Sequence, residues 1–169
     1  VSAAAAYGIL YYVYGRLASM FTFGMMGQPD AFGTHALILM AGFAAVSREE
    51  ARRALGLSPD ETYVLSFGGS LGAEYVNDAV VKLAAALTEK PSVRLLHAAG
   101  KRDYDRIRAD WDATPAGACD RTVLVDYIYD MPVQMAAADL VISRAGAMSI
   151  SELALTGKPT VFIPSPYVA

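Results

Sequence analysis

The chain has 169 residues, a net charge of −3 and a pI near 5.3. This length suits one sizeable core, or a domain of about 120 residues with an appendage. The charge argues against a general nucleic-acid binder, because such proteins carry an excess of Lys and Arg, so phosphate recognition must be local. Cys119 has no disulfide partner, and two histidines offer little material for a metal site. We therefore expect cytosolic chemistry with no metal, no cofactor and no nucleic-acid partner.

The first 46 residues are strongly apolar. Arg16 is the only charge in residues 3–26, and a second apolar run covers residues 36–41. The segment is long enough to span a bilayer, but Arg16 would lie near the middle and three glycines interrupt the pattern. It does not read as a signal peptide, because no positive charge precedes the apolar run. Three interpretations stay open for residues 1–46: a membrane segment, an artificial extension, or a buried element.

From Ser47 onward, short apolar runs alternate with helical patterns. Ser47 and Glu50 form a capping box that starts a short helix, and Gly56 closes it. Strands are expected at residues 62–67, 93–97, 122–125, 140–142 and 160–163, alternating with helices at 72–89, 101–111, 131–138 and 148–156. In the helix at 72–89, Asp78 and Lys82 are placed for a surface ion pair. The alternation predicts an α/β fold, a Rossmann-like parallel sheet with helices on both faces, and one domain over residues 47–169.

A glycine-rich turn, Gly68-Gly69-Ser70, follows the first expected strand and leads into a helix. Glycine permits close backbone approach and positive φ, while Ser70 offers a hydroxyl and an N–H beside a helix N-terminus, the layout of a phosphate cradle. The turn matches neither the dinucleotide pattern nor a P-loop, since no Lys-Ser or Lys-Thr follows Gly72. A packing role for these glycines remains an open alternative.

A second turn of this kind follows the fourth expected strand. Gly146 and Ala147 are small enough for a ligand to approach the backbone, and free N–H groups follow at Met148, Ser149 and Ile150. Glu152 lies one turn into the helix, where a carboxylate can accept hydrogen bonds from a sugar diol. The pair of turns would meet at one edge of a parallel sheet, as in nucleotide-binding α/β domains. Alternatively, Glu152 only complements the helix dipole.

A third loop, residues 126–131, joins a strand to a helix. Its backbone can face a base edge, with Ile128 as an apolar wall, or it is a plain connection with Asp130 as N-cap. His97 is more simply a strand-end residue than a catalytic base. No catalytic residue is assigned in this chain.

Together these segments resemble the MurG family, the UDP-N-acetylglucosamine:lipid I N-acetylglucosaminyltransferases of bacterial peptidoglycan synthesis. The resemblance covers residues 47–169 and is carried by residues 67–73 with Asn77, 126–131, 138–147, 151–152, 157–159 and 163–168. It implies that the chain holds most of the carboxy-terminal, donor-binding half of a two-domain GT-B fold. The acceptor-binding domain would precede this part, and the family's His-Gln and Asn loop for the donor sugar would begin just beyond Ala169.

The resemblance also implies roles for the residues of the three turns. The diphosphate would lie by Gly68, Gly69 and Ser70 and by the second turn at Gly146, Ala147, Met148 and Ser149. The uracil and ribose would be held by the Ile128 backbone, Arg144 and Glu152. One departure is Glu74, which stands where a basic residue is frequent in the family and weakens the local field for a diphosphate.

The expected parent activity is inverting transfer of N-acetylglucosamine from UDP-N-acetylglucosamine to lipid I, giving lipid II. Lipid I would bind through the other domain, and the enzyme would lie in the cytoplasm, peripheral to the inner face of the cell membrane. This chain would be inactive alone. Open alternatives are a non-catalytic UDP-sugar-binding module, a module that docks on a membrane or partner, and another GT-B sugar-nucleotide enzyme such as an epimerase.

Overall fold

The computed structural model describes residues 46–164, with residues 1–45 and 165–169 outside it. Five side chains of the last helix are also outside the description: Ala147, Met148, Ser151, Glu152 and Leu155. In the described part, no helix is long and apolar enough to cross a membrane. The three interpretations of residues 1–46 therefore stay open.

Five strands and five α-helices alternate along the described residues. The strands are β1 (Thr62–Phe67), β2 (Val93–Ala98), β3 (Thr122–Val125), β4 (Leu140–Arg144) and β5 (Thr160–Ile163). The helices are α3 (Arg48–Ala54), α4 (Glu74–Leu87), α5 (Tyr104–Asp112), α6 (Met131–Ala137) and α7 (Ala147–Thr156), with a 3-10 helix η1 (Pro115–Ala118). Each strand and helix expected from the sequence is present, whereas η1 was not expected. The predicted α/β class is confirmed.

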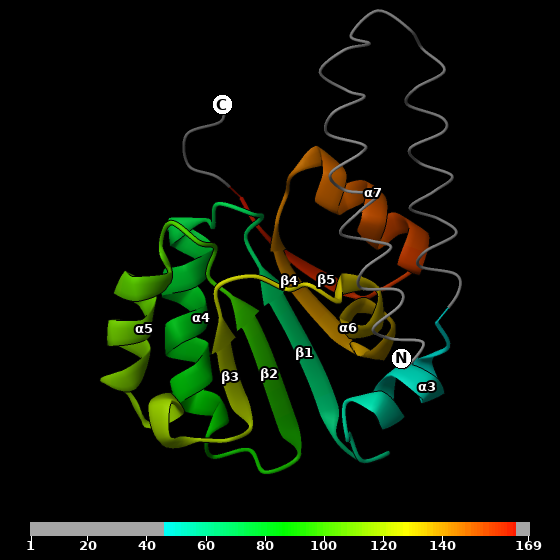
Figure 1. The fold of residues 1–169 in the computed structure, drawn as a ribbon, viewed down its shortest axis with the longest axis horizontal. Helices are drawn as coiled ribbons and strands as arrows, with labels where there is room; N and C mark the ends of the chain where they lie inside the picture. Colours follow the sequence, from blue (N-terminus) through cyan, green and yellow to red (C-terminus); the bar gives the residue numbers. More distant parts are fainter. Residues whose placement is uncertain (1–45, 165–169) are drawn as a thin grey trace, which may run out of the picture.

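The five strands form one parallel sheet in the order β3-β2-β1-β4-β5 (Figure 1). The chain first adds β2 and β3 on one side of β1, and then returns to add β4 and β5 on the other. This reversal places a topological switch point between β1 and β4, where open α/β sheets bind ligands beyond the carboxyl ends of their strands. Phe67 and Ser143 are register partners, so β1 and β4 reach that edge at the same level.

Helices cover both faces of the sheet. Leu65 of β1 packs in one core with residues of α3, α6 and α7, whereas Val64 packs in a second core with residues of α4 and α5. Successive strand residues point to opposite faces, so a strand between two helical layers is apolar almost throughout. This explains why the central strand β1 is buried from Tyr63 to Phe67.

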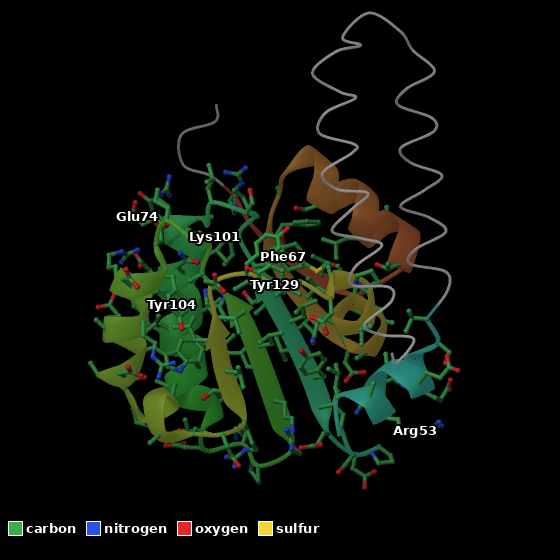
Figure 2. The ribbon with its side chains drawn as sticks, in the orientation of Figure 1. Arg53, Phe67, Glu74, Lys101, Tyr104 and Tyr129 are labelled. Atoms are coloured by element: carbon green, nitrogen blue, oxygen red, sulfur yellow. The ribbon has the colours of Figure 1, made fainter. Side chains whose placement is uncertain are left out.

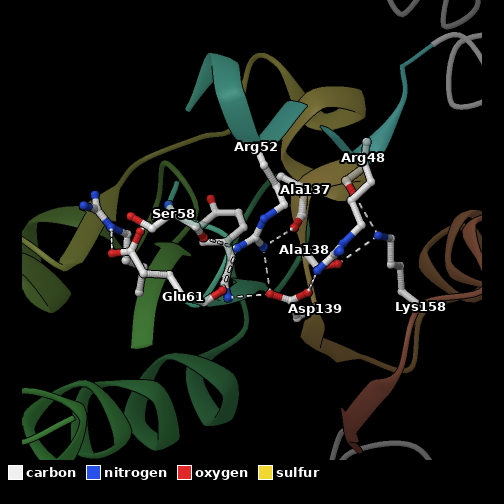
Figure 3. Close-up of polar contacts among 11 residues, drawn as sticks. Arg48, Arg52, Ser58, Glu61, Ala137, Ala138, Asp139 and Lys158 are labelled. Atoms are coloured by element: carbon white, nitrogen blue, oxygen red, sulfur yellow. Dashed lines mark hydrogen bonds and ion pairs between the residues drawn. The ribbon is translucent and has the colours of Figure 1, made fainter. Parts of the chain in front are cut away.

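Helix α3 starts at a capping box and is tied to the sheet by Arg52 (Figure 3). The Ser47 hydroxyl accepts a hydrogen bond from the Glu50 N–H at 3.2 Å, as the sequence predicted. The Arg52 guanidinium is buried and donates to the Asp139 carboxylate at 2.9 Å and to the Ser58 carbonyl at 2.7 Å. The same network includes the Glu61 carbonyl, so α3 is anchored to segments before β1 and before β4.

Candidate functional site

The carboxyl ends of β1 and β4 present the two glycine turns next to each other. Residues 68–73 lead from β1 into α4, and residues 145–146 lead from β4 into α7. Because β1 and β4 are hydrogen-bonded neighbours, the two turns share the switch point of the sheet. Figure 1 shows both at the same edge, with the loop from β3 to α6 crossing near them. The expectation that the turns meet at one sheet edge is confirmed.

The first turn exposes backbone where a ligand can approach it. Gly68 is buried, and a Cβ there would lie 2.6 Å from the Ala73 nitrogen, so no larger residue fits. Gly69 has φ of +94° and open space where a side chain would project, and Ser70 beside it is exposed. Helix α4 begins after Ala73 without a side-chain cap, which leaves its first N–H groups available to an anion. This geometry suits the phosphate-cradle interpretation and also gives Gly68 the packing role that was left open.

The turn after β1 is pressed against the turn after β2. A Cβ on Gly72 would lie 2.1 Å from the Ala99 carbonyl oxygen, and a Cβ on Gly100 would lie 2.1 Å from the Gly72 nitrogen. The buried Asn77 side chain of α4 donates to the same Ala99 carbonyl at 3.0 Å. Two positive-φ glycines and one amide therefore hold the two turns in a single arrangement.

The second turn places a cation and a hydroxyl near a helix start. Gly146 is the N-cap of α7, and no side chain caps the helix there. A Cβ on Gly146 would lie 3.9 Å from Arg144 Nη2 and 3.8 Å from Ser149 Oγ, so both side chains border the exposed backbone. Ala147, Met148 and Glu152 belong to α7, but their side chains lie outside the description. The roles assigned to them stay predictions.

In the third loop, residues 126–131, the Ile128 side chain does not form the apolar wall that was expected to face a ligand. Ile128 is only 4% exposed and packs in the core with Phe67 and Val133, so its side chain serves the core. The aromatic rings of Tyr127 and Tyr129 flank it and pack edge to face, with 5.1 Å between centroids. A role for the Ile128 backbone at a base edge stays a prediction.

One charged residue of this edge was missed by the sequence reasoning. Lys101 follows Gly100 in the turn after β2, and its Nζ lies 5.5 Å from the centroid of the Tyr127 ring and 5.8 Å from that of Tyr129. Figure 2 labels Lys101, Tyr129 and Phe67 at the same end of the sheet, where β1 ends. The position of Lys101 just after an expected strand was the signal available in the sequence. Only the strand order reveals that this strand, β2, lies next to β1.

His97 is a core residue. Its ring is buried, stacks on Trp111 with 6.2 Å between centroids, and lies 3.1 Å from the Ser66 hydroxyl through Nδ1. Burial disfavours the charged ring and lowers the pKa of His97 to about 4. The residue is therefore neutral at pH 7 and shielded from the edge that carries the turns, in keeping with a structural role at the strand end.

Comparison with known proteins assigns the chain to a family. Residues 63–169 match the family model described as the Glycosyltransferase family 28 C-terminal domain. The chain belongs to this family. Curated relatives include the UDP-N-acetylglucosamine--N-acetylmuramyl-(pentapeptide) pyrophosphoryl-undecaprenol N-acetylglucosamine transferase of Acetivibrio thermocellus, 42% identical over 123 residues and 73% of this chain. The protein of the same name from Desulforudis audaxviator is 37% identical over 161 residues and 90% of this chain.

One solved structure agrees with this assignment to family 28, and a second shares the fold. The crystal structure of Acinetobacter baumannii MurG is 27% identical and has a TM-score of 0.56, over 75% of this chain and 35% of that one. UDP-GlcNAc 2-epimerase from Neisseria meningitidis, bound to UDP-GlcNAc, has a TM-score of 0.50 over 75% of this chain and 34% of its own, and at 11% identity it supports the fold alone. The resemblance to the MurG family is thus confirmed.

The chain spans about a third of the length of the first curated relative, and 43% of the Desulforudis audaxviator protein. Residues 47–169 number 123 and make up 73% of the chain. A match that covers 90% of the chain therefore also includes residues that precede Ser47. Part of the apolar segment is therefore included in the match to that relative.

Proposed function

We propose that this chain supplies the donor-binding part of an inverting glycosyltransferase that moves N-acetylglucosamine from UDP-N-acetylglucosamine to lipid I. The observation that carries the proposal is the placement of two uncapped, glycine-led helix starts at the switch point between β1 and β4. Membership of glycosyltransferase family 28 and the names of the curated relatives support the reaction class. A negatively charged diphosphate is the group that such helix starts favour.

The proposed site residues follow the two turns and the third loop. The diphosphate would contact Gly68, Gly69 and Ser70 of the first turn and Gly146, Ala147, Met148 and Ser149 of the second. The ribose and uracil would contact Glu152, Arg144 and the Ile128 backbone. The open space at Gly69 supports the contact of that residue with the diphosphate. The position of Arg144 Nη2 near Gly146 supports the contact of Arg144 with the nucleotide.

In the proposed reaction, a lipid I hydroxyl oxygen attacks the anomeric carbon of the donor sugar. The bond from that carbon to the diphosphate breaks, the hydroxyl proton passes to a base, and UDP leaves with its negative charge. The described residues suit stabilisation of the leaving UDP, because helix starts and backbone N–H groups are fixed before the charge develops. We assign no base to this chain, and the lipid I site would belong to the rest of the enzyme.

Two further features of the proposal concern location and partners. The enzyme would lie in the cytoplasm at the inner face of the cell membrane, because its acceptor is a lipid. A non-catalytic UDP-sugar-binding module, a module that docks on a membrane or partner, and another GT-B sugar-nucleotide enzyme are the competing functions. The epimerase neighbour keeps the last of these open, since it shares the fold at low identity.

Nucleotide titration tests the proposal. We expect the 169-residue chain to bind UDP and UDP-N-acetylglucosamine by calorimetry, and to bind ADP at least about tenfold more weakly, a difference of about 1.4 kcal/mol. Glu152→Ala should weaken both uridine nucleotides, whereas Glu89→Ala, a matched change in the turn after α4, should weaken neither. If calorimetry detected binding of none of the three nucleotides, the result would instead support an interaction module. Vesicle flotation of the chain with and without residues 1–46 would test that module's membrane contact.

An activity assay separates the donor-binding role from complete catalysis. Incubated with UDP-N-acetylglucosamine and lipid I, the purified chain should form no lipid II, because we place the acceptor site and the base elsewhere. Detectable transfer by the chain alone would overturn this part of the proposal.

A further inference from the structure

The turn after β2 carries a cation that the site residues named above do not include. The Lys101 side chain is exposed, and its Nζ lies over the rings of Tyr127 and Tyr129. Both rings belong to the loop from β3 to α6. An ammonium held over two aromatic faces is attracted by their electrons and is kept in one region without being neutralised. The Lys101 ammonium thus has a preferred position at this edge that no carboxylate of the described residues provides.

The backbone that carries Lys101 is held in place by three contacts. Gly100 is pressed against Gly72 of the first glycine turn, and the Gly100 N–H donates to the Asp126 carbonyl at 3.1 Å. Asn77 binds the carbonyl of Ala99, two residues before Lys101. The start of the lysine stem is thus placed firmly beside the first glycine turn, while its four-carbon chain is free to swing.

The neighbouring cations are already paired. Arg102 bonds Asp103 at 2.9 Å, and Arg106 bonds Asp78 at 3.1 Å. In the part of the chain that the structure describes, neither Lys101 nor Arg144 has an ion-pair partner. Because β1 lies between β2 and β4, the turn that carries Lys101 and the strand end that carries Arg144 lie on opposite sides of the β1 end.

We propose that Lys101 binds the diphosphate of the donor nucleotide from the side of β2 and stabilises the charge on the departing UDP. This rests on the proposed function, because it names a further ligand of the same site. An ammonium offers three donors and a compact charge to phosphate oxygens. Glu74 in the first turn of α4 adds a negative charge at this site, so a cation from the adjacent turn offsets it. Binding of the diphosphate draws Lys101 from the tyrosine rings towards the glycine turn.

The test compares Lys101→Met and Lys101→Arg with Lys90→Met in the 169-residue chain. Lys90 is also exposed but precedes β2, at the opposite edge of the sheet, so its loss makes the same charge change far from the site. Calorimetry with UDP, UMP and uridine separates phosphate contacts from base contacts. Thermal unfolding of each variant shows that the fold is kept.

Lys101→Met should weaken UDP binding about fivefold, the strength of an exposed ion pair at its upper range, and leave uridine binding unchanged. It should also reduce the salt dependence of UDP binding, because one screened charge is lost. Lys101→Arg and Lys90→Met should stay within about twofold of the unaltered chain.

Three results would overturn the inference. UDP binding unchanged in Lys101→Met would remove the diphosphate contact, with the proposed function intact. An equal loss for UDP and uridine would show that Lys101 acts on the nucleoside. If the unaltered chain bound none of the three ligands, the proposed function would fail and this inference with it.

Discussion

Five glycines of the described residues have positive φ, but their surroundings, and therefore their structural roles, differ. Gly69 has open space where a side chain would project, whereas a Cβ on Gly72 would collide with the Ala99 carbonyl at 2.1 Å. Gly69 thus exposes backbone, and Gly72 lets two turns touch. From sequence alone both belong to one glycine-rich motif, since the second contact depends on a residue 27 positions further along the chain.

These glycines give a first prediction. Gly72→Ala should lower the free energy of unfolding by roughly 3 kcal/mol, from strain at positive φ and from overpacking. Gly69→Ala introduces only the backbone strain and should lower the free energy of unfolding by about 1–2 kcal/mol, so it serves as the matched control. Urea unfolding measures both, and equal losses in the two variants would contradict the contact between the turns.

His97 gives a prediction about pH. Burial lowers its pKa to about 4 in the folded chain, against about 6.5 when unfolded, so the unfolded state binds more protons between these values. The free energy of unfolding should therefore fall as the pH is lowered from about 6.5 to about 4, by about 3 kcal/mol from this group. In His97→Gln the slope with pH over this window should be clearly smaller. An unchanged slope would show that His97 titrates normally in the folded chain.

At the scale of elements, helix boundaries were predictable because their signals are local. The capping box at Ser47 and the closing Gly56, with φ of +64°, lie within the segment they delimit. Partners between elements were not predictable in this way. Asp78 was expected to pair with Lys82 one turn along its own helix, but it bonds Arg106 of α5 at 3.1 Å. That expectation was wrong because α5 packs beside α4, which no local spacing reveals.

The attachment of α3 supports a third prediction. Arg52→Met leaves the Ser58 and Glu61 carbonyls without their buried donor, while Asp139 keeps the Tyr63 N–H and Arg48. The change should lower the free energy of unfolding by about 2 kcal/mol. Arg53→Met, at an exposed position of the same helix, should change it by less than about 0.5 kcal/mol. Urea unfolding followed by the fluorescence of Trp111, the only tryptophan, measures both. A loss shared by the two variants would mean that helix propensity matters rather than the network.

At the scale of the whole molecule, residues 47–169 were predicted to form one domain. Two cores of described residues fill the faces of one sheet, and α3 is anchored to that sheet by Arg52. A chain lacking residues 1–45 should therefore unfold cooperatively, with a free energy of unfolding within about 1 kcal/mol of the full chain. Circular dichroism during urea unfolding measures this. Loss of the folded state would instead favour the interpretation of the apolar segment as a buried element.

The sequence by itself determined the fold class, the order of the elements and the two glycine turns, because periodicity, caps and turn residues act over a few positions. Tertiary structure decided which of these features are neighbours. The order β3-β2-β1-β4-β5 brings the turns that follow β1 and β4 to neighbouring strand ends and sets the turn of Lys101 and the strand end at Arg144 on opposite sides of β1. The packing of the helices places Ile128 in the core. Such contacts join residues far apart in the chain, and they form only when hydrophobic burial selects one pairing of strands for the whole sheet.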